Sequence, residues 1–179
     1  MFAMMKRVKL YQTLEDRGNP DYIESRGPFV CKRKDAWLGW GAYFWENDLP
    51  QATMWGAQYQ DGFVICESEY DADNKNYLDL TTWEHYESMK KCQAMLEKKT
   101  NGNKVSLSQI IEFLKNANKF PYKAIRYVFR KVDTNPIIVS EWYQAVLLPP
   151  AESTQVCVVG DGFLLDDKYK IIYPPDYVL

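Results

Sequence analysis

A segment rich in glycine and aromatic residues (residues 38–57, the glycine-aromatic segment) is the part of this sequence best suited to bind a flat ligand. Gly39 and Gly41 permit backbone torsions and close approaches that residues with a side chain resist. Tyr43, Phe44 and Trp45 follow as three consecutive aromatic residues, which on a strand must face both sides of a sheet. Two interpretations stay open. Either the segment is a buried core strand, or it forms a pocket wall in which Tyr43 stacks on a planar ligand and Gly41 admits its phosphate or ribose.

The composition restricts the class of protein that presents this segment. A chain of 179 residues with 46% apolar and 26% charged residues is typical of one globular domain. A formal net charge of -2 gives no overall attraction to nucleic acid or anionic lipid. No apolar run is long enough for a membrane span, and the N-terminus reads apolar and then basic, the reverse of a secretory signal. We therefore expect a cytoplasmic protein of one α+β domain over residues 1–179, without membrane association.

The elements around the glycine-aromatic segment follow from periodicity and turn signals. Asn19 before Pro20 favours a helix start, and Asp48 with Gln51 three residues later matches a capping box. Predicted in the first part of the chain are a strand over 8–13, a helix from Pro20 to a stop at Gly27, a short strand ending at Trp45, a helix from Asp48 that ends at Asp61 and Gly62, and a strand over 63–70. Predicted further on are an extended piece over 78–80, a helix from Thr81 or Thr82 to about Lys99, a helix from Ser106 that stops before Phe120, and strands over 137–148, 156–159 and 169–173.

Three motifs occur in a characteristic order along the chain. They are Leu10-Tyr11-Gln12-Thr13, then Gly39-Trp40-Gly41-Ala42-Tyr43-Phe44, then Ala52 and Trp55 on the next predicted helix. This order resembles the ADP-ribosyltransferase superfamily, in the branch shared by poly-ADP-ribose polymerases and small bacterial toxins of the diphtheria-toxin type. The resemblance covers the first 60 or so residues well and the C-terminal strands loosely.

The resemblance implies a split β core of two small sheets with inserted helices, and NAD bound between the sheets as a substrate, with no metal. It implies a mono-ADP-ribosyltransferase that transfers ADP-ribose to a macromolecular acceptor (protein, DNA or RNA). Such an enzyme would act as a bacterial toxin or defence effector, and a cognate inhibitor protein could bind it. The residues that it assigns to NAD binding are Tyr11, Gln12, Thr13, Gly41, Tyr43, Phe44 and Trp55.

The sequence departs from the family pattern at two catalytic positions. Gln12 replaces the first-strand histidine; it can exchange hydrogen bonds with a ribose but cannot titrate. Gln155 falls where the family has its catalytic glutamate, which stabilises positive charge on the ribose. Glu152, on the predicted loop before that strand, substitutes if the loop folds inward. The predicted catalytic residues are therefore Tyr43 with Gln155 or Glu152.

Other chemistry-bearing residues give weaker signals. His85 is the single histidine, which excludes any site with two histidine ligands from one chain. It is predicted to lie at the surface or in a groove. Glu67 and Glu69, with two aspartates that follow, could hold a divalent cation, but their alternation fits a solvent-facing strand edge at least as well. The four cysteines lie far apart without a Cys-x-x-Cys pair and are predicted to be buried hydrophobic residues.

Two alternatives to a transferase stay open. Loss of both the histidine and the glutamate is what a non-catalytic member of the fold that binds a nucleotide or a partner protein would show. An unrelated α+β protein whose aromatic segment is core would bind no NAD at all.

Overall fold

The computed structural model describes residues 6–130, 138–140, 146–147, 152–165 and 169–178. Its centre is a seven-stranded mixed sheet in the order β4-β5-β8-β2-β1-β3-β9, in which β4 and β5 are parallel and all other neighbours antiparallel. The strands are β1 Arg7–Glu15, β2 Ala42–Glu46, β3 Phe63–Asp71, β4 Tyr77–Asp79, β5 Ala124–Arg130, β8 Glu152–Val158 and β9 Lys170–Tyr173. A separate pair joins β6 Ile138–Ser140 and β7 Val146–Leu147. The chain is an α+β protein, as predicted.

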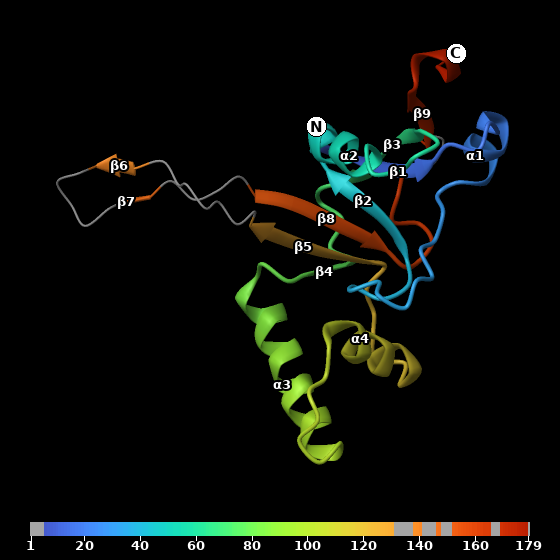
Figure 1. Cartoon of the computed structure of the whole chain (residues 1–179). Helices are drawn as coiled ribbons and strands as arrows, with labels where there is room; N and C mark the ends of the chain where they lie inside the picture. Colours follow the sequence, from blue (N-terminus) through green and yellow to red (C-terminus); the bar gives the residue numbers. More distant parts are fainter. Residues whose placement is uncertain (1–5, 131–137, 141–145, 148–151, 166–168, 179) are drawn as a thin grey trace, which may run out of the picture.

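The helices lie at two ends of the sheet (Figure 1). They are α1 Pro20–Arg26, α2 Leu49–Gly56, α3 Trp83–Lys99 and α4 Leu107–Asn116, with a short 3-10 helix over Pro175–Tyr177. On one face of the sheet, α2 packs on Tyr11, Trp45 and Ile65, while α3 and α4 pack around Ile125 and Cys157. No helix among the described residues is long and apolar enough to cross a membrane.

The sheet is continuous, but its two central strands, β1 and β2, pair over only a short stretch. We expected two small sheets, and the structure instead joins the strands into one. The joint between β1 and β2 has only the register pairs Leu10–Glu46 and Tyr11–Trp45, whereas β1 pairs with β3 along its whole length. Beyond Tyr11 the strands β1 and β2 diverge. The segment before β2 (residues 27–41) forms an isolated antiparallel bridge there, between Cys31 and Gly41. The sheet therefore has two halves held by a short seam.

Within the described residues, the predicted starts of α2 and α4 have side-chain caps, whereas Asn19 before α1 and Thr82 before α3 make no side-chain cap hydrogen bond. The Asp48 side chain accepts a hydrogen bond from the Gln51 backbone N–H at 3.0 Å at the start of α2, but Gln51 Oε1 has no hydrogen-bond partner in the part of the chain that the structure describes, so only half of the predicted capping box forms. Ser106 and Gln109 form the reciprocal capping box that begins α4. The predicted end of α2 at residues 61–62 is wrong, because the helix ends at Gly56. A Cβ at Gly56 would overlap the Phe63 ring, so the chain turns there and packs back on β3.

The C-terminal strands differ from expectation in two respects. Strand β8 begins at Glu152, four residues before the predicted start at Val156, because its ladder with β5 continues to the pair Glu152–Arg130. Glu152 therefore lies on the strand and not on a preceding loop. Strand β5, which was not predicted, contributes the other side of that ladder. Of the strand predicted over 137–148, the structure describes only β6 and β7.

Candidate functional site

A pocket of about 290 Å³ opens where β1 and β2 diverge. Its walls come from β1, the segment before β2, β2 itself, α2 with the turn after it, and β8. Six of its lining residues are aromatic: Phe29, Trp37, Tyr43, Trp45, Trp55 and Tyr59. The volume is just below the range of about 300–1,000 Å³ for small-molecule sites. An aromatic lining of this kind suits a flat ring system.

The pocket brings together five of the residues that the sequence singled out. They are Gln12, Thr13, Tyr43, Trp55 and Gln155. They come from β1, β2, α2 and β8, so they lie far apart in the chain and meet only through the sheet topology. Tyr43 and Gln155, the two residues whose common location matters most for the family resemblance, line the same cavity.

Tyr43 is held in place by its hydroxyl group. The hydroxyl accepts a hydrogen bond from the Leu38 N–H at 3.0 Å and donates one to the Gly39 carbonyl at 2.7 Å. Burial raises the pKa of Tyr43, so the phenol stays neutral and keeps both bonds. The ring is thus fixed in the pocket wall while its hydroxyl shapes the turn before β2.

Gln155 is held by Trp37, a residue that the sequence reasoning missed. The Trp37 indole N–H donates to Gln155 Oε1 at 2.9 Å, and the indole also contacts the Tyr127 ring edge-on at 4.7 Å between centroids. Gln155 is 8% exposed. Because an indole N–H can only donate, the amide oxygen must face Trp37, and the NH₂ group remains the donor that Gln155 can offer to a ligand.

Gln12 has a structural task in addition to lining the pocket. Its Nε2 donates to the Phe29 carbonyl at 2.8 Å, and its Oε1 accepts from the Phe29 N–H at 3.0 Å and from the Tyr169 hydroxyl at 2.7 Å. The side-chain amide therefore pairs with the backbone of residue 29 as a neighbouring strand would. With 3% exposure and three hydrogen bonds, Gln12 anchors the segment that forms the pocket rim.

Thr13 and Trp55 connect the pocket to α2. The Thr13 hydroxyl donates to the Ala52 carbonyl at 2.9 Å. Trp55 is partly exposed and contacts Trp45 in a tilted arrangement, with ring centroids 6.2 Å apart. This pair forms an apolar side of the cavity.

Three predicted binding residues lie outside the lining. Tyr11 and Phe44 are buried in separate clusters of the core. Gly41 lies beside β8, where a Cβ would overlap Cys157 Sγ and come within 2.7 Å of the Val158 carbonyl. Packing between β2 and β8 thus explains this glycine without a ligand. Within the glycine-aromatic segment, Phe44 lies in the core and Tyr43 lines the pocket.

Glu152 does not line the pocket. It is exposed at the start of β8, three positions before Gln155, and side chains an odd number of positions apart on a strand face opposite sides of the sheet. Asp35 is the one carboxylate among the described lining residues. It is exposed and forms an ion pair with Arg33 at 2.6 Å, which lowers the pKa of the Asp35 carboxyl group.

The weaker candidates have structural roles. Glu67 and Glu69 pair across the sheet with Lys9 at 3.0 Å and Arg7 at 3.1 Å, on the neighbouring strand β1. His85 accepts a hydrogen bond at Nδ1 from the Asp79 N–H at 2.9 Å, so this half-buried ring stabilises the turn between β4 and α3.

No protein-family model, curated protein or solved structure matches this chain. The interpretation of the pocket therefore rests on its own geometry and on the motif resemblance.

The residues that sequence reasoning missed are those whose partners are remote. Trp37 meets Gln155 across a sequence separation of 118 residues. Phe29 lines the pocket and also binds Gln12 through its backbone, a contact that residue type does not reveal. For Trp37 a signal did exist, because it lies directly before the glycine-aromatic segment.

Proposed function

We propose that this protein is ADP-ribosyltransferase-like and binds NAD in the aromatic pocket, with the nicotinamide ring among the aromatic side chains. One observation carries the proposal: Tyr43 and Gln155, chosen from sequence motifs, line one cavity together with Gln12, Thr13 and Trp55. The pocket opens beside the short joint between β1 and β2, within one continuous sheet and not between two sheets as the resemblance implies.

The proposed reaction breaks the glycosidic bond between ribose C1′ and the nicotinamide nitrogen. The bonding electrons leave with nicotinamide, C1′ becomes cationic, and a nucleophile of the acceptor bonds to C1′ and loses its proton to water. In the proposed complex Tyr43 and Trp55 hold the leaving ring, and the Thr13 hydroxyl, which donates to the Ala52 carbonyl, accepts a hydrogen bond from a ribose hydroxyl. Gln155 donates an N–H to a ribose oxygen, which orients the sugar but adds no negative charge.

The same geometry favours a second candidate, a member of this fold that binds a nucleotide without cleaving it. A cationic ribose is stabilised by a nearby anion. Gln155 is neutral, and the exposed Glu152 faces the other side of the sheet. A binding protein needs the pocket but not the charge.

One experiment separates the two candidates. Purified protein is incubated with NAD, and nicotinamide release is measured by chromatography beside NAD binding by calorimetry. Binding with release supports the transferase, and binding without release supports the second candidate. Absence of binding would contradict both.

A further inference from the structure

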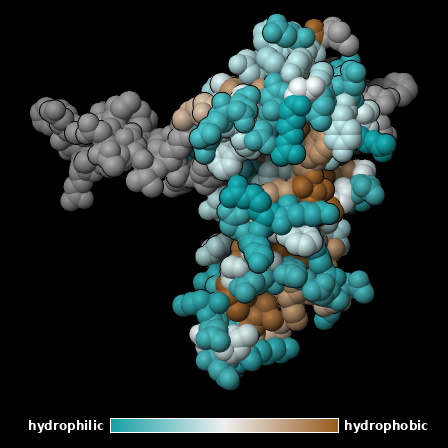
Figure 2. All heavy atoms as spheres, turned by 45° about the vertical axis from the view of Figure 1, so that its right-hand side comes forward, coloured by the Kyte–Doolittle hydropathy of each residue, from teal (hydrophilic) through white to brown (hydrophobic). Residues whose placement is uncertain are grey.

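A second cavity of about 490 Å³ adjoins the aromatic pocket. It lies between the segment before β2 and helix α4, and it shares Arg33 and Ala36 with the aromatic pocket. Figure 2 shows hydrophobic side chains reaching the surface on this side of the molecule, between its upper and lower parts. A ligand in the second cavity would therefore lie next to a ligand in the first.

Two lysines give this cavity a positive character. Lys34 and Lys115 both line it, and among the described residues neither has a carboxylate within ion-pair distance. Lys115 is half-buried, with its ammonium 5.6 Å from the Phe120 ring centroid, and burial lowers the pKa of its side chain. Glu112 also lines the cavity, and Arg33 is paired with Asp35. A cation that is partly removed from water without a counter-ion gains from a bound anion.

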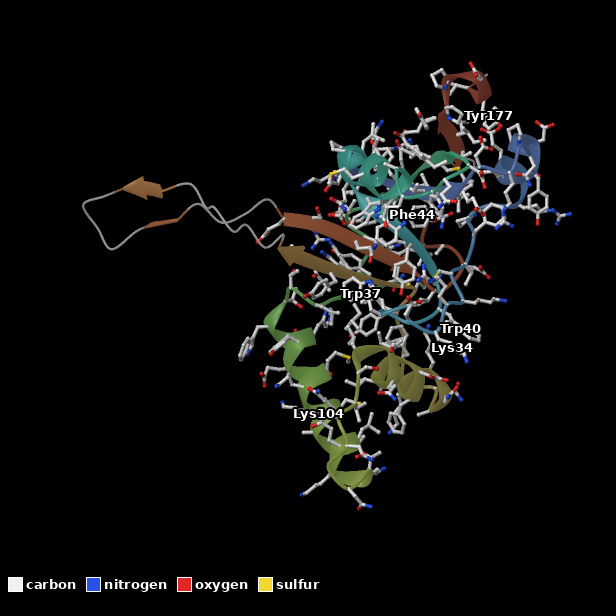
Figure 3. The ribbon with its side chains drawn as sticks, viewed as in Figure 1. Lys34, Trp37, Trp40, Phe44, Lys104 and Tyr177 are labelled. Carbon is white, nitrogen blue, oxygen red and sulfur yellow. The ribbon has the colours of Figure 1, made fainter. Side chains whose placement is uncertain are left out.

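An exposed indole lies beside these cations. Trp40 lines the cavity and is 59% exposed. Figure 3 shows Trp40 and Lys34 next to each other on the outer side of the segment before β2. An exposed aromatic ring beside cationic side chains is the combination that binds single-stranded nucleic acid, because the base stacks on the ring and the phosphates meet the cations.

We propose that this cavity binds single-stranded nucleic acid, with a base on Trp40 and the backbone phosphates at Lys34 and Lys115. The exposed Lys32 continues the positive charge outside the cavity lining, along the path of a strand longer than one nucleotide. The strand is then the acceptor of ADP-ribose, a step that rests on the proposed function. In that step a base or ribose nucleophile bonds to C1′ as nicotinamide leaves, and its proton passes to water.

The binding itself is tested without NAD. Fluorescence anisotropy measures the affinity of the full chain for labelled 12-nucleotide single-stranded RNA and DNA of mixed sequence. Base–aromatic stacking is worth about 1–3 kcal/mol per base, so Trp40→Ala should weaken binding by about fivefold or more. Lys34→Gln should weaken it too and reduce the slope of log affinity against log salt by about 0.7.

Matched controls exist on α3 and beyond its end. Trp83 is 73% exposed at the start of α3 and is not among the residues that line the cavity. Lys104 is exposed before α4, and Figure 3 shows it away from Lys34 and Trp40. Trp83→Ala and Lys104→Gln should leave the affinity unchanged. All four positions are exposed, so the variants should keep the wild-type melting temperature.

Three results would overturn the proposal: no binding of either strand, equal losses in the control variants, or equal displacement of the strand by adenosine monophosphate or a phosphopeptide of matched charge. Loss of NAD affinity in Trp40→Ala without strand binding would assign the cavity to the adenosine half of NAD instead. Strand binding in a protein that binds no NAD would leave the nucleic-acid site standing and refute the proposed function alone.

Discussion

The Trp37 indole N–H donates a hydrogen bond to Gln155 Oε1 at 2.9 Å, joining the segment before β2 to strand β8. Both residues line the aromatic pocket. The bond orients the Gln155 amide, since the indole can meet only its oxygen. A glutamate at this position would accept the same bond with one oxygen and present the second oxygen in place of the NH₂ group. A single substitution at Gln155 would thus add a second carboxylate to the described lining of the pocket, in addition to the Asp35 that is paired with Arg33.

Gln155→Glu should raise nicotinamide release from NAD. A carboxylate near a cationic ribose needs to stabilise the transition state by only about 1.4 kcal/mol to give a tenfold faster reaction. Glu152→Gln, the matched change on the opposite face of β8, should leave release unchanged. Chromatographic assay of wild type and both variants checks this. A slower Gln155→Glu enzyme together with an inactive Glu152→Gln enzyme would show that Glu152 is the catalytic carboxylate.

Two substitutions of Tyr43 should distinguish the role of its ring in NAD binding from the role of its hydroxyl in stability. Tyr43→Ala should lower NAD affinity by about 1–3 kcal/mol through loss of stacking. Tyr43→Phe keeps the ring but leaves the Leu38 N–H and the Gly39 carbonyl without their partner, so it should cost about 1–3 kcal/mol of folding free energy with little change in affinity. Calorimetry and urea denaturation measure the two quantities. Equal NAD affinity in wild type and Tyr43→Ala would make Tyr43 a purely structural residue.

Replacement of Gln12 should reduce the folding free energy more than replacement of a partly exposed strand residue would. Gln12→Ala removes the partners of the Phe29 N–H, the Phe29 carbonyl and the Tyr169 hydroxyl, and should cost about 3 kcal/mol of folding free energy. Tyr169→Phe removes one of these bonds and should cost about 1 kcal/mol. Urea denaturation of both variants tests this order. A Gln12→Ala protein as stable as wild type would show that the hydrogen bonds to Phe29 are not needed to hold the pocket rim.

The protein should lose stability in alkaline solution from about pH 9 upward. Burial raises the pKa of the Cys157 thiol from 9.0 to about 12. Below pH 9 the thiol is protonated in both states; above it, the unfolded thiol ionises while the folded one stays neutral. The free energy of unfolding should therefore fall by about 1.4 kcal/mol per pH unit for this group. Burial also raises the pKa values of Tyr43, Tyr70 and Tyr169, which should steepen the fall above about pH 10.

Cys157→Ala provides the control for this pH dependence. The variant is less stable at neutral pH because of the cavity it creates, but its stability should decline less steeply between pH 9 and 10. Denaturation midpoints at several pH values give the slopes, and identical slopes for the two proteins would contradict the assignment to Cys157.

Local chemistry explains which parts of the fold could be predicted from the sequence. The start of α4 depends on Ser106 and Gln109, three residues apart, and the start of α2 on Asp48. Strand β5 could not be predicted because its pairing with β4 and β8 is non-local. Arg126 within it forms a half-buried ion pair with Glu46 at 2.8 Å. From sequence alone, a charged residue such as Arg126 is expected at the surface, because its partner Glu46 is not known.

The site residues show the same difference between local signals, which the sequence carries, and non-local contacts, which it does not. Motif order selected Tyr43, Thr13 and Gln155, because residue type and spacing carry that signal. The structural roles of Gln12 and Gly41 depend on Phe29 and on strand β8, whose positions only the folded chain defines.

Titration of NAD into the purified protein by calorimetry tests the central claim most directly. We predict saturable binding to wild type, weaker binding to Tyr43→Ala, and wild-type affinity in Trp83→Ala, which removes an exposed indole that does not line the pocket. Absence of binding, or affinity that is the same in all three proteins, would contradict the assignment of the aromatic pocket to NAD.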